Sequence, residues 1–133
     1  MTVTESRAPH ILIVDDEPDM VWAMGNAMQS EGYAVSSVTS GAEVVELLVQ
    51  ADFDVAFVDA MLPDWDGMEL AALIHQQQPR TAIVLVSGYF YEEDPAITEG
   101  LQTGLYMGFV AKPFDLEEIR RLARRAVGCN AEV

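Results

Sequence analysis

Cysteine, positive charge and long apolar segments are all scarce in this sequence. Cys129 is the single cysteine, so no disulfide can form within the chain. Lys and Arg total 7 against 22 Asp and Glu, and the formal net charge of −15 disfavours direct binding to DNA or to anionic lipid. No apolar run approaches the roughly 20 residues that span a bilayer, and residues 1–10 lack the apolar core of a signal peptide. We therefore expect a cytoplasmic protein with no membrane partner.

Hydrophobic residues, in contrast, fill 50% of the 133 positions, enough to bury the core of one domain. We assign that domain to residues 10–128, between short tails at 1–9 and 129–133. Apolar runs typical of buried strands alternate with segments of helical periodicity. The runs are 11–14, 33–38, 54–58, 82–86 and 109–111; the helical segments are 18–30, 42–50, 67–77, one from Pro95 to about Gly104, and 116–127.

This alternation of strands and helices predicts an α/β fold. Five successive units imply a parallel sheet with helices on both faces. The length of the crossovers favours a flavodoxin-like, doubly wound five-stranded sheet with strand order 2-1-3-4-5. Local signals agree, because Asp94-Pro95 can begin a helix and Gly32 and Gly104 can each end one.

Polar residues follow the predicted strands where they end. Asp15, Asp16 and Glu17 follow the first strand, Asp59 the third, Ser87 the fourth and Lys112 the fifth. Strands 1 and 3 are neighbours in this order, so the three aspartates should converge at the ligand-binding edge of the sheet. Like charges this close destabilise one another unless a hard cation such as Mg²⁺ joins them. Taken singly, the residues have plainer interpretations as a helix cap, a turn serine and a surface lysine.

Four motifs in this order resemble the signature of response-regulator receiver domains, the chemotaxis-receiver-like domains of two-component signal transduction. They are IVDDEP at 13–18, DAMLPDWDG at 59–67, VSG at 86–88 and KPF at 112–114. Each motif alone is weak, but together they extend the resemblance over essentially the whole chain.

The resemblance implies a role for each residue at the strand ends. Asp59 would take a phosphoryl group from the phosphohistidine of a sensor histidine kinase or of a phosphotransfer protein. Lys112 and Ser87 would contact the phosphoryl oxygens. The chain would be no enzyme in the usual sense, because it would catalyse only its own phosphorylation and dephosphorylation. Mg²⁺, for which Mn²⁺ could substitute, would be held by Asp15, Asp16, Asp59 and the backbone carbonyl of Met61.

The resemblance also implies an output. Ser87 and Phe109 would act as switch residues that reshape the surface of the fourth helix, the fifth strand and the fifth helix. A downstream effector protein or domain, or a homodimer partner, would read that surface, with no direct nucleic-acid binding by this domain. In this family the bond between Lys112 and the proline after it is often cis. The rest of the pocket would consist of Gly88, Tyr89 and Pro113.

Two other functions are open on the same residues. A Mg²⁺-dependent phosphatase of the haloacid-dehalogenase type also uses an aspartate nucleophile after a strand, but it needs a second aspartate where this chain has Met61. A phosphorylation-independent scaffold would share the fold, and the loss of an acidic pocket residue would favour it. No such residue is missing. Tyr106 competes with Phe109 for the switch position.

Two surfaces away from the strand ends have alternative interpretations. The last helix is either a solvated face, supported by a Glu117–Arg121 pair, or a docking face for an acidic partner. Met20 and Trp22, on the first helix, could belong to the surface that meets the histidine kinase in this family. The basic residues of the last helix are Arg120, Arg121, Arg124 and Arg125.

Overall fold

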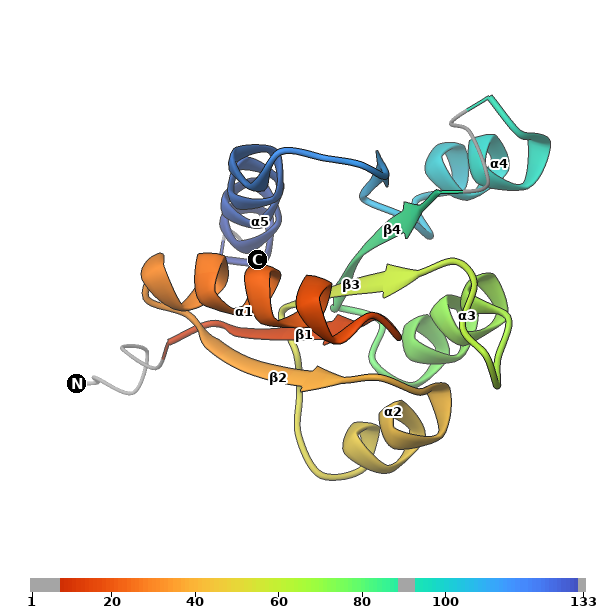
Figure 1. Cartoon of the computed structure of the whole chain (residues 1–133). Helices are drawn as coiled ribbons and strands as arrows, with labels where there is room; N and C mark the ends of the chain where they lie inside the picture. The colour runs from red at the N-terminus through yellow and green to blue at the C-terminus, as the bar shows by residue number, and fades with distance from the viewer. Residues whose placement is uncertain (1–7, 89–92, 132–133) are drawn as a thin grey trace.

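A computed structural model describes residues 8–88 and 93–131 of the chain (Figure 1). Its strands are β1 (His10–Val14), β2 (Ala34–Val38), β3 (Val55–Asp59), β4 (Ala82–Ser87) and β5 (Gly108–Ala111). Its helices are α1 (Pro18–Ser30), α2 (Gly41–Leu48), α3 (Gly67–Gln77), α4 (Pro95–Thr103) and α5 (Leu116–Ala131). Within this described part, no helix is both long and apolar enough to cross a bilayer.

The strands form one parallel sheet in the order β2-β1-β3-β4-β5, which confirms the predicted fold class. Successive side chains of a strand point to opposite faces, so each inner strand supplies two hydrophobic layers. Leu12 and Val58 pack with α2, α3 and α4 on one face, whereas Ile13 and Phe57 pack with α1 and α5 on the other (Figure 1). Both faces of the sheet are therefore covered, as the apolar strands require.

The helices begin at the edge where the strands end, and local signals fix their starts. Ser40 and Asp66 cap α2 and α3, each with a side-chain oxygen that accepts a backbone N–H of the first turn. α1 and α4 begin with Pro18 and Pro95. Proline has no N–H, but the first residue of a helix needs none, because its N–H has no partner within the helix. α4 ends at Gly104, which adopts a φ of 85° that favours glycine.

Some element ends differ from the prediction. β3 and β4 each run one residue further, because Asp59 and Ser87 still pair with the neighbouring strands. α2 ends at Leu48, where the chain tightens into a turn, instead of at residue 50. α5 runs past residue 127 to Ala131, through positions assigned above to a tail. Gly128 does not stop it, because one glycine costs a helix only about 1 kcal/mol.

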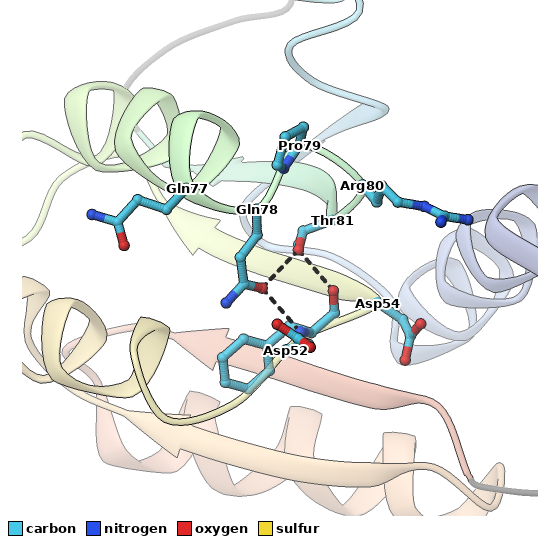
Figure 2. Close-up of a pocket in the computed structure, with 8 residues that line it drawn as sticks. Asp52, Asp54, Gln77, Gln78, Pro79, Arg80 and Thr81 are labelled. Atoms are coloured by element: carbon cyan, nitrogen blue, oxygen red, sulfur yellow. Dashed lines mark hydrogen bonds between the residues drawn. The ribbon is translucent and has the colours of Figure 1, made fainter. Parts of the chain in front are cut away.

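At the edge where the strands begin, one amide side chain joins two loops (Figure 2). Gln78 Oε1 accepts the Phe53 N–H at 3.0 Å and lies 3.1 Å from the Thr81 hydroxyl, which also donates to the Phe53 carbonyl at 2.7 Å. Gln78 Nε2 donates to the carbonyls of Leu48 and Ala51 at 3.2 and 2.7 Å. The loops before β3 and before β4 are thus held together by neutral hydrogen bonds. We call this group the Gln78 clamp.

Candidate phosphoacceptor site

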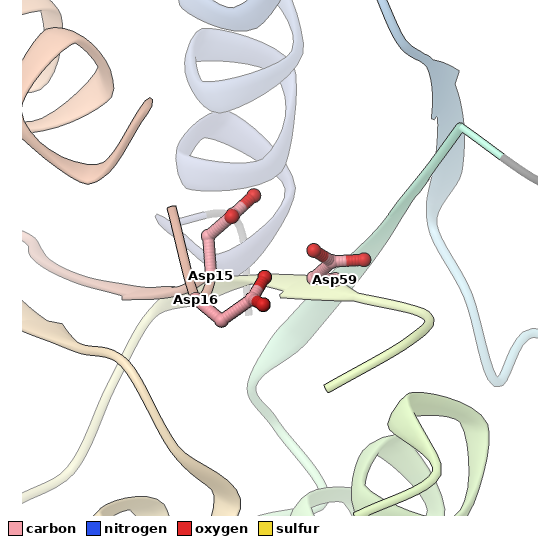
Figure 3. A group of neighbouring side chains, drawn as sticks. All are labelled: Asp15, Asp16 and Asp59. Carbon is pink, nitrogen blue, oxygen red and sulfur yellow. The ribbon is translucent and has the colours of Figure 1, made fainter. Parts of the chain in front are cut away.

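Three aspartates meet where β1 and β3 end (Figure 3). Asp59 is the last residue of β3, and Asp15 and Asp16 directly follow β1, which pairs in parallel with β3. Asp15 and Asp59 are only 2% and 5% exposed, whereas Asp16 is exposed. One carboxylate oxygen from each lies within 4.8 Å of the other two. Three hard oxygen donors at this spacing suit a divalent cation such as Mg²⁺.

Lys112, the only lysine of the chain, lies among these acids. Its Nζ is 2.9 Å from Asp15 Oδ2, 3.1 Å from Asp59 Oδ2 and 3.0 Å from Glu17 Oε1. Burial alone would lower the pKa of Lys112, but hydrogen bonds to Asp15 and Glu17 and the surrounding negative charge raise it above its usual value. Lys112 therefore stays protonated and balances part of the charge of the cluster.

Asp59 is held in an environment that opposes its ionisation. Burial raises the pKa of Asp59, and the nearby charge of Asp15 acts in the same direction. The Met61 N–H, which donates to Asp59 Oδ1 at 3.0 Å, and the ammonium of Lys112 only partly counteract them. A nearly buried carboxylate with a raised pKa destabilises the folded state when it is ionised. Such a group is typical of a functional site.

The loop after Asp59, residues 60–66, turns back sharply toward α3. Gly67, the first residue of α3, lies so close to Asp59 that a Cβ on it would overlap the Asp59 carbonyl oxygen. The Gly67 N–H donates to the Ala60 carbonyl at 2.9 Å, which closes the loop. The loop thereby keeps the backbone of Met61 beside Asp59. The Met61 side chain, which is 48% exposed, has no acidic group for a phosphatase-type proton transfer.

Ser87 ends β4 next to Lys112. Its side chain is almost fully buried, and its carbonyl accepts the Lys112 N–H at 2.8 Å. Gly88 is exposed, and among residues 8–88 and 93–131 a Cβ on it would touch only the Lys112 side chain. The peptide bond between Lys112 and Pro113 is cis. Tyr89, predicted to be part of the pocket, lies outside the described residues.

The two rival switch aromatics differ in how firmly they are packed. Tyr106 is 4% exposed, and its ring lies against Gly100 of α4, where a Cβ would overlap it. Phe109, in β5, is only partly buried and packs at the margin of the same hydrophobic cluster. Phe109 is therefore the less tightly packed of the two rings.

An open cavity of about 650 Å³ gives access to the cluster. The sequence assigned no role to Glu17, although it both lines the cavity and contacts Lys112. Its proximity to Lys112 depends on how the loops after β1 and β5 fold, which no motif reports. The lining residues are Asp16, Glu17, Asp59, Met61, Leu62, Pro63, Gly88 and Lys112.

The predicted Glu117–Arg121 pair is wrong. Among the described residues, Glu117 pairs with Arg120 and Arg124, each at 3.5 Å. Arg124 also contacts Glu31 at the end of α1 at 2.8 Å, because α5 packs against α1. On α1 itself, Trp22 is 73% exposed. Its predicted place in a kinase-docking surface stays a prediction.

Comparisons with known proteins agree with this geometry. A family model described as the response regulator receiver domain matches residues 11–124. The chain belongs to the response regulator receiver family. It is 33% identical over 122 residues to the transcriptional regulatory protein TcrA of Mycobacterium tuberculosis (strain ATCC 25618 / H37Rv), covering 86% of this chain but only 46% of that relative. The chain thus spans less than half the length of this relative.

Solved structures of receiver domains have the same fold. A CheY-like response regulator receiver domain protein from Methanospirillum hungatei JF-1 has a TM-score of 0.85 at 24% identity, covering 94% of this chain and 98% of that chain. The response regulator TrrA from Thermotoga maritima, solved in complex with Mg²⁺-BeF, has a TM-score of 0.75 at 24% identity, covering 89% and 98%. Both likenesses establish the receiver fold.

Proposed function

We propose that this receiver domain accepts a phosphoryl group on Asp59 from a sensor histidine kinase or a phosphotransfer protein. A carboxylate oxygen of Asp59 forms a bond to the phosphorus of a phosphohistidine, while the P–N bond breaks and its electron pair returns to the imidazole nitrogen. The observation that carries the proposal is the environment of Asp59. It is a nearly buried carboxylate, bonded to the Met61 N–H and to Lys112, that lines an open cavity.

The donors around Asp59 fit Mg²⁺, which prefers a few carboxylates together with water and phosphate oxygens. When bound, Mg²⁺ neutralises the charge that the phosphoryl group brings to the acidic cluster. Mn²⁺ would substitute, since it favours the same oxygen ligands. The Mg²⁺-BeF complex of the Thermotoga protein supports this choice of ion. The proposed ligands are Asp15, Asp16, Asp59 and the backbone carbonyl of Met61.

Two further residues receive the phosphoryl group in this proposal. Lys112 pairs with one phosphoryl oxygen as a point charge, and it exchanges a carboxylate partner to do so. Ser87, from the neighbouring strand β4, donates its hydroxyl to a second oxygen. Gly88 keeps the entrance open beside them. The domain thus acts on itself: it promotes its own phosphorylation and the later hydrolysis of its acyl phosphate, with no separate substrate to turn over.

The proposed output surface is formed by α4, β5 and α5. Once Ser87 moves toward the phosphoryl oxygens, Phe109 rotates inward beneath α4, because an apolar ring gains free energy by leaving water. A downstream effector protein or domain, or a homodimer partner, reads the change. The regulatory relative suggests an effector that controls transcription, and the net charge of −15 implies that any DNA contact belongs to a different domain. We place this signalling in the cytoplasm, away from the membrane surface.

The proposal is tested by labelling with acetyl phosphate and Mg²⁺, followed by measurement of the intact mass. The wild-type chain should gain one phosphoryl group, and Asp59→Asn should gain none. Asp52→Asn, the same change at an exposed acid on the opposite edge of the sheet, should be labelled like the wild type. Equal labelling of Asp59→Asn would exclude Asp59 as the phosphoacceptor.

A further inference from the structure

The shape of the loop at residues 60–66 is fixed by its own hydrogen bonds. The Met61 N–H donates to Asp59 Oδ1, and the Leu62 N–H donates to the Trp65 carbonyl at 3.3 Å. Together with the bond that closes the loop at Gly67, these contacts determine its internal conformation. They do not by themselves determine where the loop lies relative to the acids that follow β1.

Asp64, at the middle of the loop, bonds to a different element. Its Oδ1 accepts the Gly41 N–H at 3.0 Å, and its Oδ2 accepts the Ala42 N–H at 3.1 Å. These are the first two residues of α2, whose N–H groups have no acceptor within the helix and lie at its positive end. The hydrogen bond from Gly41 lowers the pKa of Asp64, so Asp64 is charged at neutral pH. The loop is thereby anchored to α2 by both carboxylate oxygens.

Trp65 makes a second contact with the same helix start. A Cβ on Gly41 would lie 2.6 Å from the Trp65 ring and 2.8 Å from its Cβ, so the close approach depends on glycine at position 41. The anchoring is separate from the local cap of α2, since Ser40 accepts the N–H of Glu43 instead. Removing Ser40 or removing Asp64 therefore perturbs the same helix start but affects the loop differently.

We infer that Asp64 is a positioning residue for the phosphoacceptor site: by binding the start of α2, it holds the loop so that the backbone of Met61 stays in place relative to Asp15 and Asp16, the acids that follow β1. The inference rests on the proposed function, because Met61 matters as a ligand only if Mg²⁺ binds at this cluster. Contacts that orient a metal ligand from outside contribute to metal affinity, since a displaced ligand binds less well.

The test is the Mg²⁺ dissociation constant of the whole chain, measured by calorimetry beside the metal-free melting temperature. Asp64→Asn should weaken Mg²⁺ binding about tenfold, the lower end of the range for residues that orient metal ligands. Gly41→Ala, which pushes Trp65 away without changing charge, should weaken it in the same direction. Two controls should stay within about twofold of the wild type. Ser40→Ala removes the local cap of α2, and Glu69→Gln removes an exposed charge from α3.

The inference is overturned if Asp64→Asn binds Mg²⁺ within twofold of the wild type, or if either control weakens binding as much as Asp64→Asn does. If Asp64→Asn does not fold, Gly41→Ala decides the question by the same criterion. A wild-type chain that binds no Mg²⁺ would overturn the proposed metal site together with this inference. Wild-type binding with an unchanged Asp64→Asn would refute the inference alone.

Discussion

The parallel sheet has one edge where its strands begin and another, the functional edge, where they end. The polar side chains at these two edges differ in charge and in bonding. Where the strands begin, the Gln78 clamp joins two loops through neutral hydrogen bonds. Where they end, Asp15, Asp59 and Glu17 surround the ammonium of Lys112 at 2.9 to 3.1 Å. Asp16 adds a fourth acid to this edge. Four acids against one lysine leave three negative charges uncompensated.

The difference separates stability from function within one fold. The partly buried Gln78 amide stabilises the native state, because removing it leaves the buried Phe53 N–H and nearby carbonyls without a partner. A cluster of like charges destabilises the native state until a cation or a ligand arrives. The edge of the sheet that contributes least to stability is therefore the edge that gains most by binding a cation or a ligand.

Removing the Gln78 clamp should have the largest effect on the free energy of unfolding. Gln78→Ala leaves the Phe53 N–H and the carbonyls of Leu48 and Ala51 without their amide partner. We expect a loss of about 3 kcal/mol in the free energy of unfolding, at about 1 kcal/mol or more per orphaned group. Denaturant unfolding measures it, with the exposed neighbour Gln77→Ala as a control that should change little. A Gln78→Ala variant as stable as this control would show that water replaces the clamp without cost.

The sequence predicted the fold and the composition of the functional edge. Apolar runs and helical periods depend on neighbours in the chain, so their alternation indicated a parallel sheet. The crossover lengths favoured the strand order, which the structure confirms. The acids that follow β1 and β3 converge because parallel strands end at one edge, a consequence of topology alone. The roles of Asp59, Lys112 and Ser87 came from the resemblance to a family and stay predictions.

The clamp and the contacts of Glu17 were not predictable in the same way. Gln78 bonds to Leu48 and Ala51, which are 30 and 27 residues away, and only the folded loops bring them together. The Glu117–Arg121 pair failed for a related reason. Helical spacing makes these residues possible partners on α5, but it cannot show that Arg120 and Arg124, which face Glu31 just after α1, are the arginines that also reach Glu117.

Lys112→Met tests the functional edge by removing its only ammonium. Without metal, we expect a loss of about 2 kcal/mol in the free energy of unfolding. This is less than for a fully buried ion pair, because the lysine side chain is 16% exposed. Millimolar Mg²⁺ should restore part of the loss, since a cation can take over the neutralisation. Arg80→Met, at an exposed position by the other edge, should change stability little. A loss that Mg²⁺ does not reduce would mean that packing of the lysine stem matters more than its charge.

Mg²⁺ itself should stabilise the folded chain by mass action. At ten times its dissociation constant, the gain in the free energy of unfolding should be about 1.4 kcal/mol. Asp16→Ala should reduce the gain, because Asp16 is an exposed member of the oxygen cluster. Gln78→Ala should gain as much as the wild type, since the two edges share no partners. Thermal unfolding at several Mg²⁺ concentrations provides the measurement. A reduced gain in Gln78→Ala would show that the edges are coupled.

The smallest expected effect is a pH dependence that belongs to the functional edge alone. Burial raises the pKa of Asp59 in the folded chain above the ordinary value of 3.8. At pH values between the ordinary pKa and the raised pKa of the folded chain, Asp59 keeps a proton in the folded state that it has lost in the unfolded state. The contribution of Asp59 to the free energy of unfolding therefore falls as the pH rises through this window, and it stays low above it.

Asp59→Asn has no such proton, so its stability relative to the wild type should increase across the same window in metal-free buffer and then level off. Gln78→Ala removes no titrating group, and its deficit relative to the wild type should be constant over that range. Denaturant unfolding of the three chains at several pH values gives both differences. If the advantage of Asp59→Asn shrank with rising pH, the Met61 N–H and Lys112 would outweigh burial at Asp59. The functional edge would then stabilise the ionised form of Asp59, whereas the raised pKa means that it destabilises this form.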